Sequence, residues 1–443
     1  MSDNFSSSPI ASLADWQAYE PPRNIARQLL VVGNGFDIAC GLPSRFVDFF
    51  DERVKALGPA CVLCGDDLVS FCRQNGLTAW DLVLASRHAT PCGFMKANWC
   101  DIESAIATVV LDRDVALIAK LCLDVRPITA YGIASYLELI DRAALQGANS
   151  EYEAYEPDEA LEAGFAFEDD FHMTPVEQFE GATARVASFI SAAYPTGEWD
   201  ENAALQALLA ELHLLEKAFA AYMVAVCEDN SAYQENSEGL LGKLICYDLP
   251  DEADCDNEAT VLNFNYTTPA IPDIAQCPIT DCINIHGVAS DEVVIGIDGK
   301  DLTSDSESIR FAKTYRLFGL RAEGVHRPVA YKRDPFVRFG ATETWTIKFY
   351  GHSLAAADYS YFQSIFDMVD LYNSDVKLYF RFSNYEAGVK EREFLRVAGL
   401  LSAYGKTLDN KDHGKNLTHK LLLEGRLSPL LQFSLRVAER YAF

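Results

Sequence analysis

Two glycines directly after a short apolar run near the start of the chain could bind a phosphate group. Residues 29–32 form a continuous apolar run, typical of a strand buried on both faces, and Gly33-Asn34-Gly35 follows it. Glycines allow a tight turn, and the N–H groups at the start of the next helix attract anions. The pattern therefore favours a nucleotide-binding turn, with an ordinary turn as the alternative.

The residues after this turn begin the expected helix. Phe36 and Asp37 lie in its first turn, where Asn34 and Asp37 could also serve only as helix caps. The third glycine of a GxGxxG pattern would fall at Ile38, so the match is incomplete. We include Phe36 and Asp37 with the glycine turn among the candidate nucleotide-binding residues.

Polar residues also end two later strand-like runs. Asn265 and Tyr266 close the run 259–265, and His286 and Gly287 close a run that begins at Cys282. Each has an ordinary alternative, because Asn-Tyr-Thr is common turn chemistry and a single histidine after a strand usually has a structural role.

A fourth run, 344–350, ends in Gly351, His352 and Ser353, and Asp358 lies on the helix expected after it. If all four runs are parallel strands, their polar ends meet at the carboxyl edge of one sheet, where open α/β folds bind ligands. Chance turns would not repeatedly place Gly, Asn, His and Ser at successive strand ends, so the four ends together predict one site.

The elements that must hold these residues predict an α/β fold. Residues 44–250 show mostly helical periodicity, clearest at 203–227, whereas β-branched and aromatic runs follow after Asn257. These runs, interleaved with helical patterns, predict a mostly parallel Rossmann-like sheet flanked by helices. The expected strands are 259–265, 282–287, 293–298, 344–351 and 376–382, in addition to the first run.

We expect the chain to be organised around an interrupted core. Residues 25–43 and 258–405 would form the nucleotide-binding core, and 44–257 would be a helical insertion between the first strand and the rest of the sheet. Residues 1–24 are expected to be a flexible lead-in and 406–443 a helical extension. Within the insertion, 151–180 holds eleven acidic side chains and no Lys or Arg. This composition favours a solvated loop. The alternative is an acidic arm that docks on a partner.

Composition and charge exclude several classes of protein. The chain has 443 residues, 49% of them apolar, and 37 Lys and Arg against 65 Asp and Glu give a net charge of −28. Such a field repels nucleic acid and anionic lipid, so a general nucleic-acid binder is disfavoured. No apolar run reaches the roughly 18 residues that cross a bilayer, and no secretory signal is visible. We therefore expect a cytoplasmic protein without a membrane partner, and the scattered cysteines are expected to be free thiols.

At this point the motifs resemble those of the bacteriophage abortive infection AbiH family. Residues 31–50 are similar to the N-terminal signature of that family, and NWCDIESAI, VLNFNYTT, INIHG, GIDGKD and FYGHSLAAADYSYFQSIF follow in the family's order. The resemblance covers about 28–385. It departs at Ser44, where the family usually has Thr, and the long acidic middle has no match.

The AbiH family is in turn distantly similar to sirtuin-like NAD-binding domains. In this resemblance, Gly33 and Gly35 match the glycines of the turn that holds the pyrophosphate. Asn265 matches the asparagine that contacts the nicotinamide ribose, and His286 matches the catalytic base. The resemblance implies a sirtuin-like fold and an antiviral NAD glycohydrolase. The four-cysteine zinc module of the deacetylases is absent from the sequence, which argues against deacetylation, and no metal site is expected.

The implied chemistry assigns catalysis to two residues. Cleavage of the nicotinamide bond passes through an oxocarbenium-like ribose, which gains from placement and electrostatics. Asn265 would orient the ribose or the water, and His286 would accept a proton near neutral pH. Asp37, Asp298 and Asp358 are the carboxylates expected nearest the cleft, and His352 is a second candidate acid or base.

Two further readings stay open. The chain could be a nucleotide-binding sensor or scaffold that uses the same pocket without turnover and acts through a partner protein or a phage trigger. A nuclease is weaker, because no metal-ligating D/E-x-K array stands out and the charge is unsuited to DNA. A homo-oligomer is compatible with either reading.

Overall fold

The core of the protein is a parallel β-sheet. The computed structural model describes residues 24–57, 63–88, 102–111, 114–124, 175–247, 249, 255–299, 302, 307–320, 342–382, 388–409, 414–428 and 431–432. Within them, six strands pair in parallel in the order β3-β2-β1-β4-β5-β6. They are β1 (Asn24–Val32), β2 (Cys255–Asn263), β3 (Ile279–Asn284), β4 (Thr342–Tyr350), β5 (Lys377–Phe382) and β6 (Leu431–Gln432). This confirms the predicted α/β fold with a parallel sheet.

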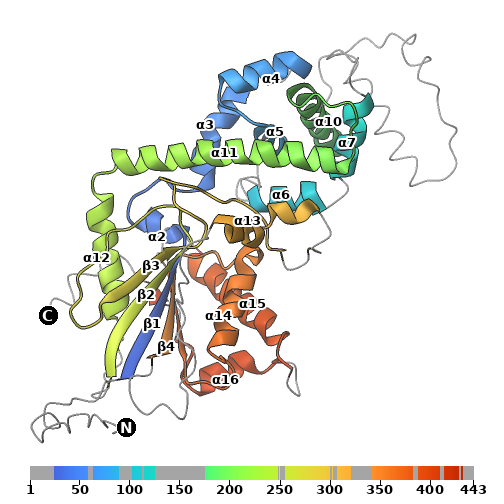
Figure 1. Cartoon of the computed structure of the whole chain (residues 1–443). Coiled ribbons are helices and arrows are strands. Elements are labelled where there is room, and N and C mark those ends of the chain that lie inside the picture. The colour runs from blue at the N-terminus through green and yellow to red at the C-terminus, as the bar shows by residue number, and fades with distance from the viewer. Residues whose placement is uncertain are drawn as a thin grey trace, which may run out of the picture.

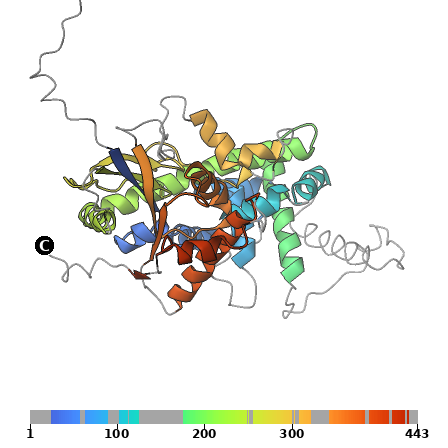
Figure 2. The same ribbon diagram turned by 90° about the horizontal axis from the view of Figure 1, so that it is seen from below.

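Strand β1 is central and buried on both faces. It pairs with β2 on one side and with β4 on the other, and Figure 2 shows it (dark blue) beside β4 (orange). Leu29 and Val31 pack in one apolar cluster, whereas Leu30 and Val32 pack in another on the opposite face. This two-sided burial explains why residues 29–32 are uniformly apolar.

Helices cover the two faces of the sheet (Figure 1). The face of Leu30 and Val32 packs against α12 (Tyr233–Cys246), which leads the chain back from the insertion to β2. The face of Leu29 and Val31 packs against helices from the last third of the chain. These are α14 (Tyr359–Met368), α15 (Val389–Gly405) and α16 (Leu417–Leu423).

A helical insertion with its own apolar core separates β1 from β2. After the short α2 (Asn34–Ala39), its largest element is α11 (Glu201–Asp229), which lies across the carboxyl edge of the sheet in Figure 1. The other described helices are α3 (Phe46–Leu57), α4 (Gly65–Gln74), α5 (Ala79–His88), α6 (Ile102–Leu111), α7 (Asp114–Asp124) and α10 (Pro175–Ala193). None of the described helices combines the length and apolar character needed to cross a membrane.

Two buried carboxylates tie the insertion together. Asp81 on α5 accepts two hydrogen bonds from the Arg53 guanidinium, at 2.6 and 2.7 Å. Glu211 on α11 pairs with Arg73 and accepts a hydrogen bond from the Ala79 N–H at 2.9 Å. Paired in this way, charges buried among apolar helices fix the relative positions of α3, α4, α5 and α11.

Residues 293–298, expected to be a strand, form only isolated bridges. Val293 bridges Gly287 and Ile297 bridges Ala312. Val293, Ile295 and Ile297 point their apolar side chains into the core of the helical insertion. The β-branched run that suggested a strand is buried against helices and does not join the sheet, so this prediction is wrong.

The later part of the chain also contains elements that the sequence did not indicate. A 3-10 helix, η3 (Glu307–Phe311), leads into α13 (Lys313–Leu320). Residues 406–443, expected to be a helical extension, contribute α16 and also β6. Two residues are too few to show a strand pattern in a sequence. The acidic segment lies outside the described residues up to Thr174, and 175–180 belong to α10.

Candidate active site

The turn after β1 packs tightly against the loop after β4. The Gly33 N–H donates to the Tyr350 carbonyl at 3.0 Å, and the Gly35 N–H donates to the Gly351 carbonyl at 2.8 Å. A Cβ atom on Gly33 would lie 2.6 Å from the Cα of His352, and one on Gly35 would lie 2.7 Å from the Cα of Gly351. Both glycines are therefore required for this close approach.

This packing uses N–H groups that a phosphate-binding turn would offer to its ligand. The Phe36 N–H is also engaged, by the Gly33 carbonyl at 2.8 Å. The exposed side chain of Asn34 accepts a hydrogen bond from Ser44. A pyrophosphate would have to find other donors at this edge, and nucleotide binding by the turn stays a prediction.

Asp37 is the centre of a buried hydrogen-bond network. It accepts hydrogen bonds from Tyr233 on α12 at 2.9 Å and from Thr267 at 2.8 Å. Burial raises its pKa to about 6, against the lowering effect of these two hydroxyl donors. The three side chains join α2, α12 and the loop after β2.

Asn265 lies close to the glycine turn. Its side-chain Nδ2 donates to the Gly33 carbonyl at 3.2 Å, and its own N–H donates to the side chain of Asn263 at 3.0 Å. Asn284, at the end of β3, donates to the Asn265 carbonyl at 2.9 Å. The carboxyl ends of β1, β2 and β3 are thus joined through asparagines.

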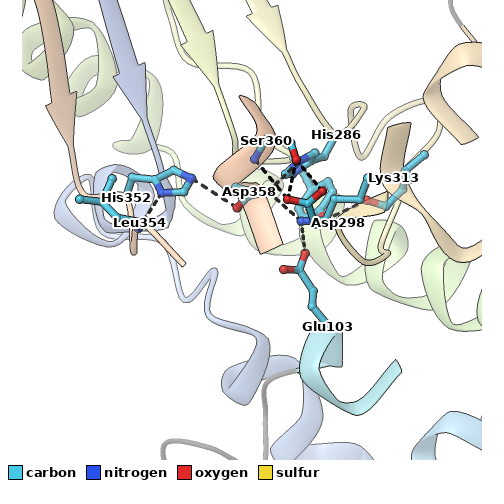
Figure 3. A network of polar contacts seen from close by, with 10 residues as sticks. Glu103, His286, Asp298, Lys313, His352, Leu354, Asp358 and Ser360 are labelled. Carbon is cyan, nitrogen blue, oxygen red and sulfur yellow. Dashed lines mark hydrogen bonds and ion pairs between the residues drawn. The ribbon is translucent and has the colours of Figure 1, made fainter. Parts of the chain in front are cut away.

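A second group of charged side chains lies beside these strand ends, and we term it the Asp358 cluster (Figure 3). Asp358 Oδ1 lies 3.3 Å from His286 Nε2 and 2.8 Å from Lys313 Nζ, and Asp358 Oδ2 lies 3.6 Å from His352 Nε2. Lys313 also forms an ion pair with Glu103 of α6. The cluster comprises Glu103, His286, Lys313, His352 and Asp358.

The Asp358 cluster is buried, and its charges determine one another. The exposed fraction is 1% for Lys313, 3% for His286 and 7% for Asp358. Burial alone would lower the pKa of Lys313, but the carboxylates of Glu103 and Asp358 raise it well above its usual range. Burial would likewise raise the pKa of Asp358, and the Lys313 ammonium outweighs it and lowers that pKa. Lys313 is therefore a cation and Asp358 an anion at neutral pH.

His352 is held as a neutral imidazole. Its Nδ1 accepts a hydrogen bond from the Leu354 N–H at 2.9 Å, which leaves the proton on Nε2, the nitrogen that faces Asp358. Burial lowers its pKa to about 4, although Asp358 acts in the opposite direction. The loop that makes this bond is strained, because Leu354 has a φ of 53°.

Aromatic rings enclose the two histidines. The Phe264 ring centroid lies 4.6 Å from that of His352 and 5.4 Å from that of His286, both edge to face. Tyr361 and Tyr266 complete the surroundings of His286, at 5.9 and 6.2 Å. An apolar enclosure strengthens electrostatic interactions inside it, so the contact between Asp358 and the histidines acts at a low effective dielectric constant.

Two loop residues support the cluster from outside. Asp298 accepts hydrogen bonds from the Ser360 hydroxyl at 2.7 and 2.8 Å and from the Ser360 N–H at 3.2 Å, which anchors the start of α14 beside Asp358. Gly287 has a φ of 90°, and a Cβ atom there would lie 2.0 Å from the Glu292 carbonyl oxygen. Ser353, in the loop after β4, is exposed.

The structure therefore joins some predicted residues and separates others. His286, His352 and Asp358 meet in one cluster, whereas Asn265 contacts the glycine turn and Asp37 faces α12. Sequence reasoning missed Lys313 and gave Glu103 no role, because neither follows a strand and their ion pair joins distant parts of the chain. Among the described residues no group of His, Cys, Asp and Glu is arranged to hold a metal ion.

Comparison with known proteins gives one match. A family model described as bacteriophage abortive infection AbiH matches residues 29–380. This range begins within β1 and ends within β5, and it includes the insertion and every member of the Asp358 cluster. Searches of curated proteins and of solved structures returned no match.

Proposed function

The chain belongs to the bacteriophage abortive infection AbiH family, and from that premise we propose that it is an antiphage effector that binds NAD and hydrolyses it to nicotinamide and ADP-ribose. Family membership supports the defence role. The NAD chemistry is our proposal, and it rests on the contact between His286 and Asp358 at the carboxyl edge of a sheet with the strand order of dinucleotide-binding folds.

The Asp358 cluster has the parts that a hydrolysis of this kind needs. A carboxylate that faces a histidine orients the imidazole and stabilises the imidazolium that forms when the ring accepts a proton. Asp358 is suited to this role because Lys313 keeps it ionised. In the proposed step, water adds to the ribose carbon, the glycosidic bond breaks, and nicotinamide leaves with the bonding electron pair. The proton of the water passes to His286.

Asn265 would orient the ribose or the attacking water through its amide, from its position beside Gly33. His352 would help to keep Asp358 in place through Nε2. The tight packing of Gly33 and Gly35 against the β4 loop does not suit a pyrophosphate at the glycine turn. The proposal therefore assigns the nicotinamide and ribose half of NAD to this edge, and the position of the phosphates is left open.

A second candidate function is a nucleotide sensor or scaffold that acts through a partner protein without turnover. The burial of His286 and Asp358 favours it, because substrate would reach them only after the surrounding loops rearrange. The exposed Ser353, in the loop after β4, would then be at the surface that a ligand or partner contacts first.

Incubation of the purified full chain with NAD, followed by chromatography of nicotinamide, separates the two functions. We expect release by the parent protein and loss of release in His286→Ala and Asn265→Ala. His419→Ala is the matched control, because His419 lies exposed on α16, and this variant should keep the parent rate.

Equal release by the His286→Ala variant and the parent would refute the proposed catalysis. No release by the parent, combined with a rise in melting temperature on adding NAD or ADP-ribose, would instead support the sensor.

A further inference from the structure

Lys313 lies at a junction between the helical insertion and the sheet. The 3-10 helix before it packs with the insertion: Phe311 is buried in the insertion core, and its ring centroid lies 6.4 Å from that of Trp80 on α5. Helices α6 and α11 both contact η3. One turn into α13, Arg316 forms a buried bidentate ion pair with Glu216 of α11, at 2.5 and 2.7 Å. The segment from Phe311 to Arg316 therefore contacts the insertion at both of its ends.

The same segment reaches into the Asp358 cluster. The Lys313 N–H donates to the Ile297 carbonyl at 3.0 Å. Asp298, which follows Ile297 in the chain, accepts a hydrogen bond from Ser360 at the start of α14. From this fixed backbone the Lys313 ammonium pairs with Asp358 on one side and with Glu103 of α6 on the other. In Figure 3, Glu103 approaches the Lys313 ammonium from α6 of the insertion, on the side opposite His286.

We propose that Lys313 is a positioning residue through which the helical insertion, by way of Glu103, holds the pair His286 and Asp358 in its working arrangement. The statement that this arrangement serves catalysis rests on the proposed function. The coupling between the insertion and the pair His286 and Asp358 does not, because it depends only on contacts within the protein. A change in the insertion that displaces α6 or η3 moves the Lys313 ammonium, and Asp358 then loses its contact with this cation.

The coupling is physically strong because Lys313 and Asp358 are both buried. Loss of one member of a buried ion pair leaves the other charge without compensation, which is far more costly than the net gain from forming the pair. Asp358 would then turn, protonate or draw in water, and each response changes the field at His286. Glu103 is partly exposed and lies one residue from the start of α6, so its loss should have a weaker effect of the same kind.

The test uses the full chain with histidine rings labelled with ¹⁵N and compares Lys313→Met and Glu103→Gln with the parent. Arg53→Met is the control, since it breaks a buried ion pair within the insertion that does not contact the cluster. At one fixed neutral pH we expect the ring signals of His286 and His352 to move in Lys313→Met, less in Glu103→Gln, and not in Arg53→Met. Amide exchange in 356–363 should rise by about tenfold or more in Lys313→Met.

NAD turnover by the same variants is measured in parallel. For Lys313→Met we expect kcat to fall while KM changes little. Unmoved histidine signals in Lys313→Met would overturn the inference, and so would equal movement in Arg53→Met, which would indicate a general loss of packing. Failure of the parent protein to cleave NAD would refute the proposed function alone, because the ring signals and the amide exchange still test the coupling.

Discussion

The buried carboxyl group of Asp37 should make the protein less stable as the pH rises. Burial raises its pKa from 3.8 to about 6. Between these two values the folded state binds a proton that the unfolded state has lost, so the free energy of unfolding falls with rising pH. The full difference is about 2.2 pKa units at 1.36 kcal/mol each, or about 3 kcal/mol. Between pH 4.5 and 7.5 about 2 kcal/mol of it should be observable.

Urea denaturation of the parent and of Asp37→Asn across this pH range measures the effect. Asparagine cannot ionise, so the stability of the parent relative to this variant should decrease by about 2 kcal/mol as the pH rises, with the change completed near pH 7. Asp66→Asn, at an exposed position on α4, is the control for general charge effects. A difference between parent and Asp37→Asn that is independent of pH, or that grows in favour of the parent, would refute the reasoning.

Three further outcomes are expected. Gly35→Ala should lower the free energy of unfolding by about 1–3 kcal/mol, because the new Cβ would lie 2.7 Å from the Cα of Gly351. The control is Gly239→Ala on α12, where a Cβ would meet nothing within 4 Å, and this variant should be neutral or stabilising. Thermal denaturation of both variants and the parent measures the difference. Lys348→Met should cost about 1–3 kcal/mol in urea denaturation, since its buried ammonium donates to the carbonyls at the end of α12, and a loss below the error of the experiment would contradict this. The ring of His352 should stay neutral with its proton on Nε2 down to about pH 5, because burial lowers its pKa to about 4, and an NMR titration midpoint near 6.5 would show otherwise.

The sequence was sufficient to predict five of the six described strands and the edge at which they end. The uniformly apolar run at 29–32 is what a strand buried between two helical layers requires, and the polar residues that end the later strands lie at one edge because the strands are parallel. His286, His352 and Asp358 could therefore be grouped before any coordinates were known. Each follows a strand or begins the helix after one.

The rest of the site depends on contacts that have no local pattern. Lys313 follows a 3-10 helix and Glu103 belongs to a helix of the insertion, so only the tertiary packing of α6 against η3 brings them together. The glycine turn differs, because it has a clear local pattern. Gly33 and Gly35 suggest a phosphate site from their types and spacing, which stays a prediction, and the structure adds a packing role against Gly351 and His352, which no short motif records.

The position of β1 in the middle of the sheet has a consequence for how the protein is made. β1 ends at Val32, and its neighbour β2 begins only at Cys255, so 222 residues separate the first strand from its first partner. At a synthesis rate of roughly 5–20 residues per second, β1 waits about 10–45 s on the ribosome before pairing can start, and longer before β4 arrives. Meanwhile the helical insertion can already collapse around its own core. Because Lys313, His352 and Asp358 are synthesised later still, a chain that has not yet reached these residues has neither the complete sheet nor the Asp358 cluster, and the cluster can assemble only after Asp358 has emerged.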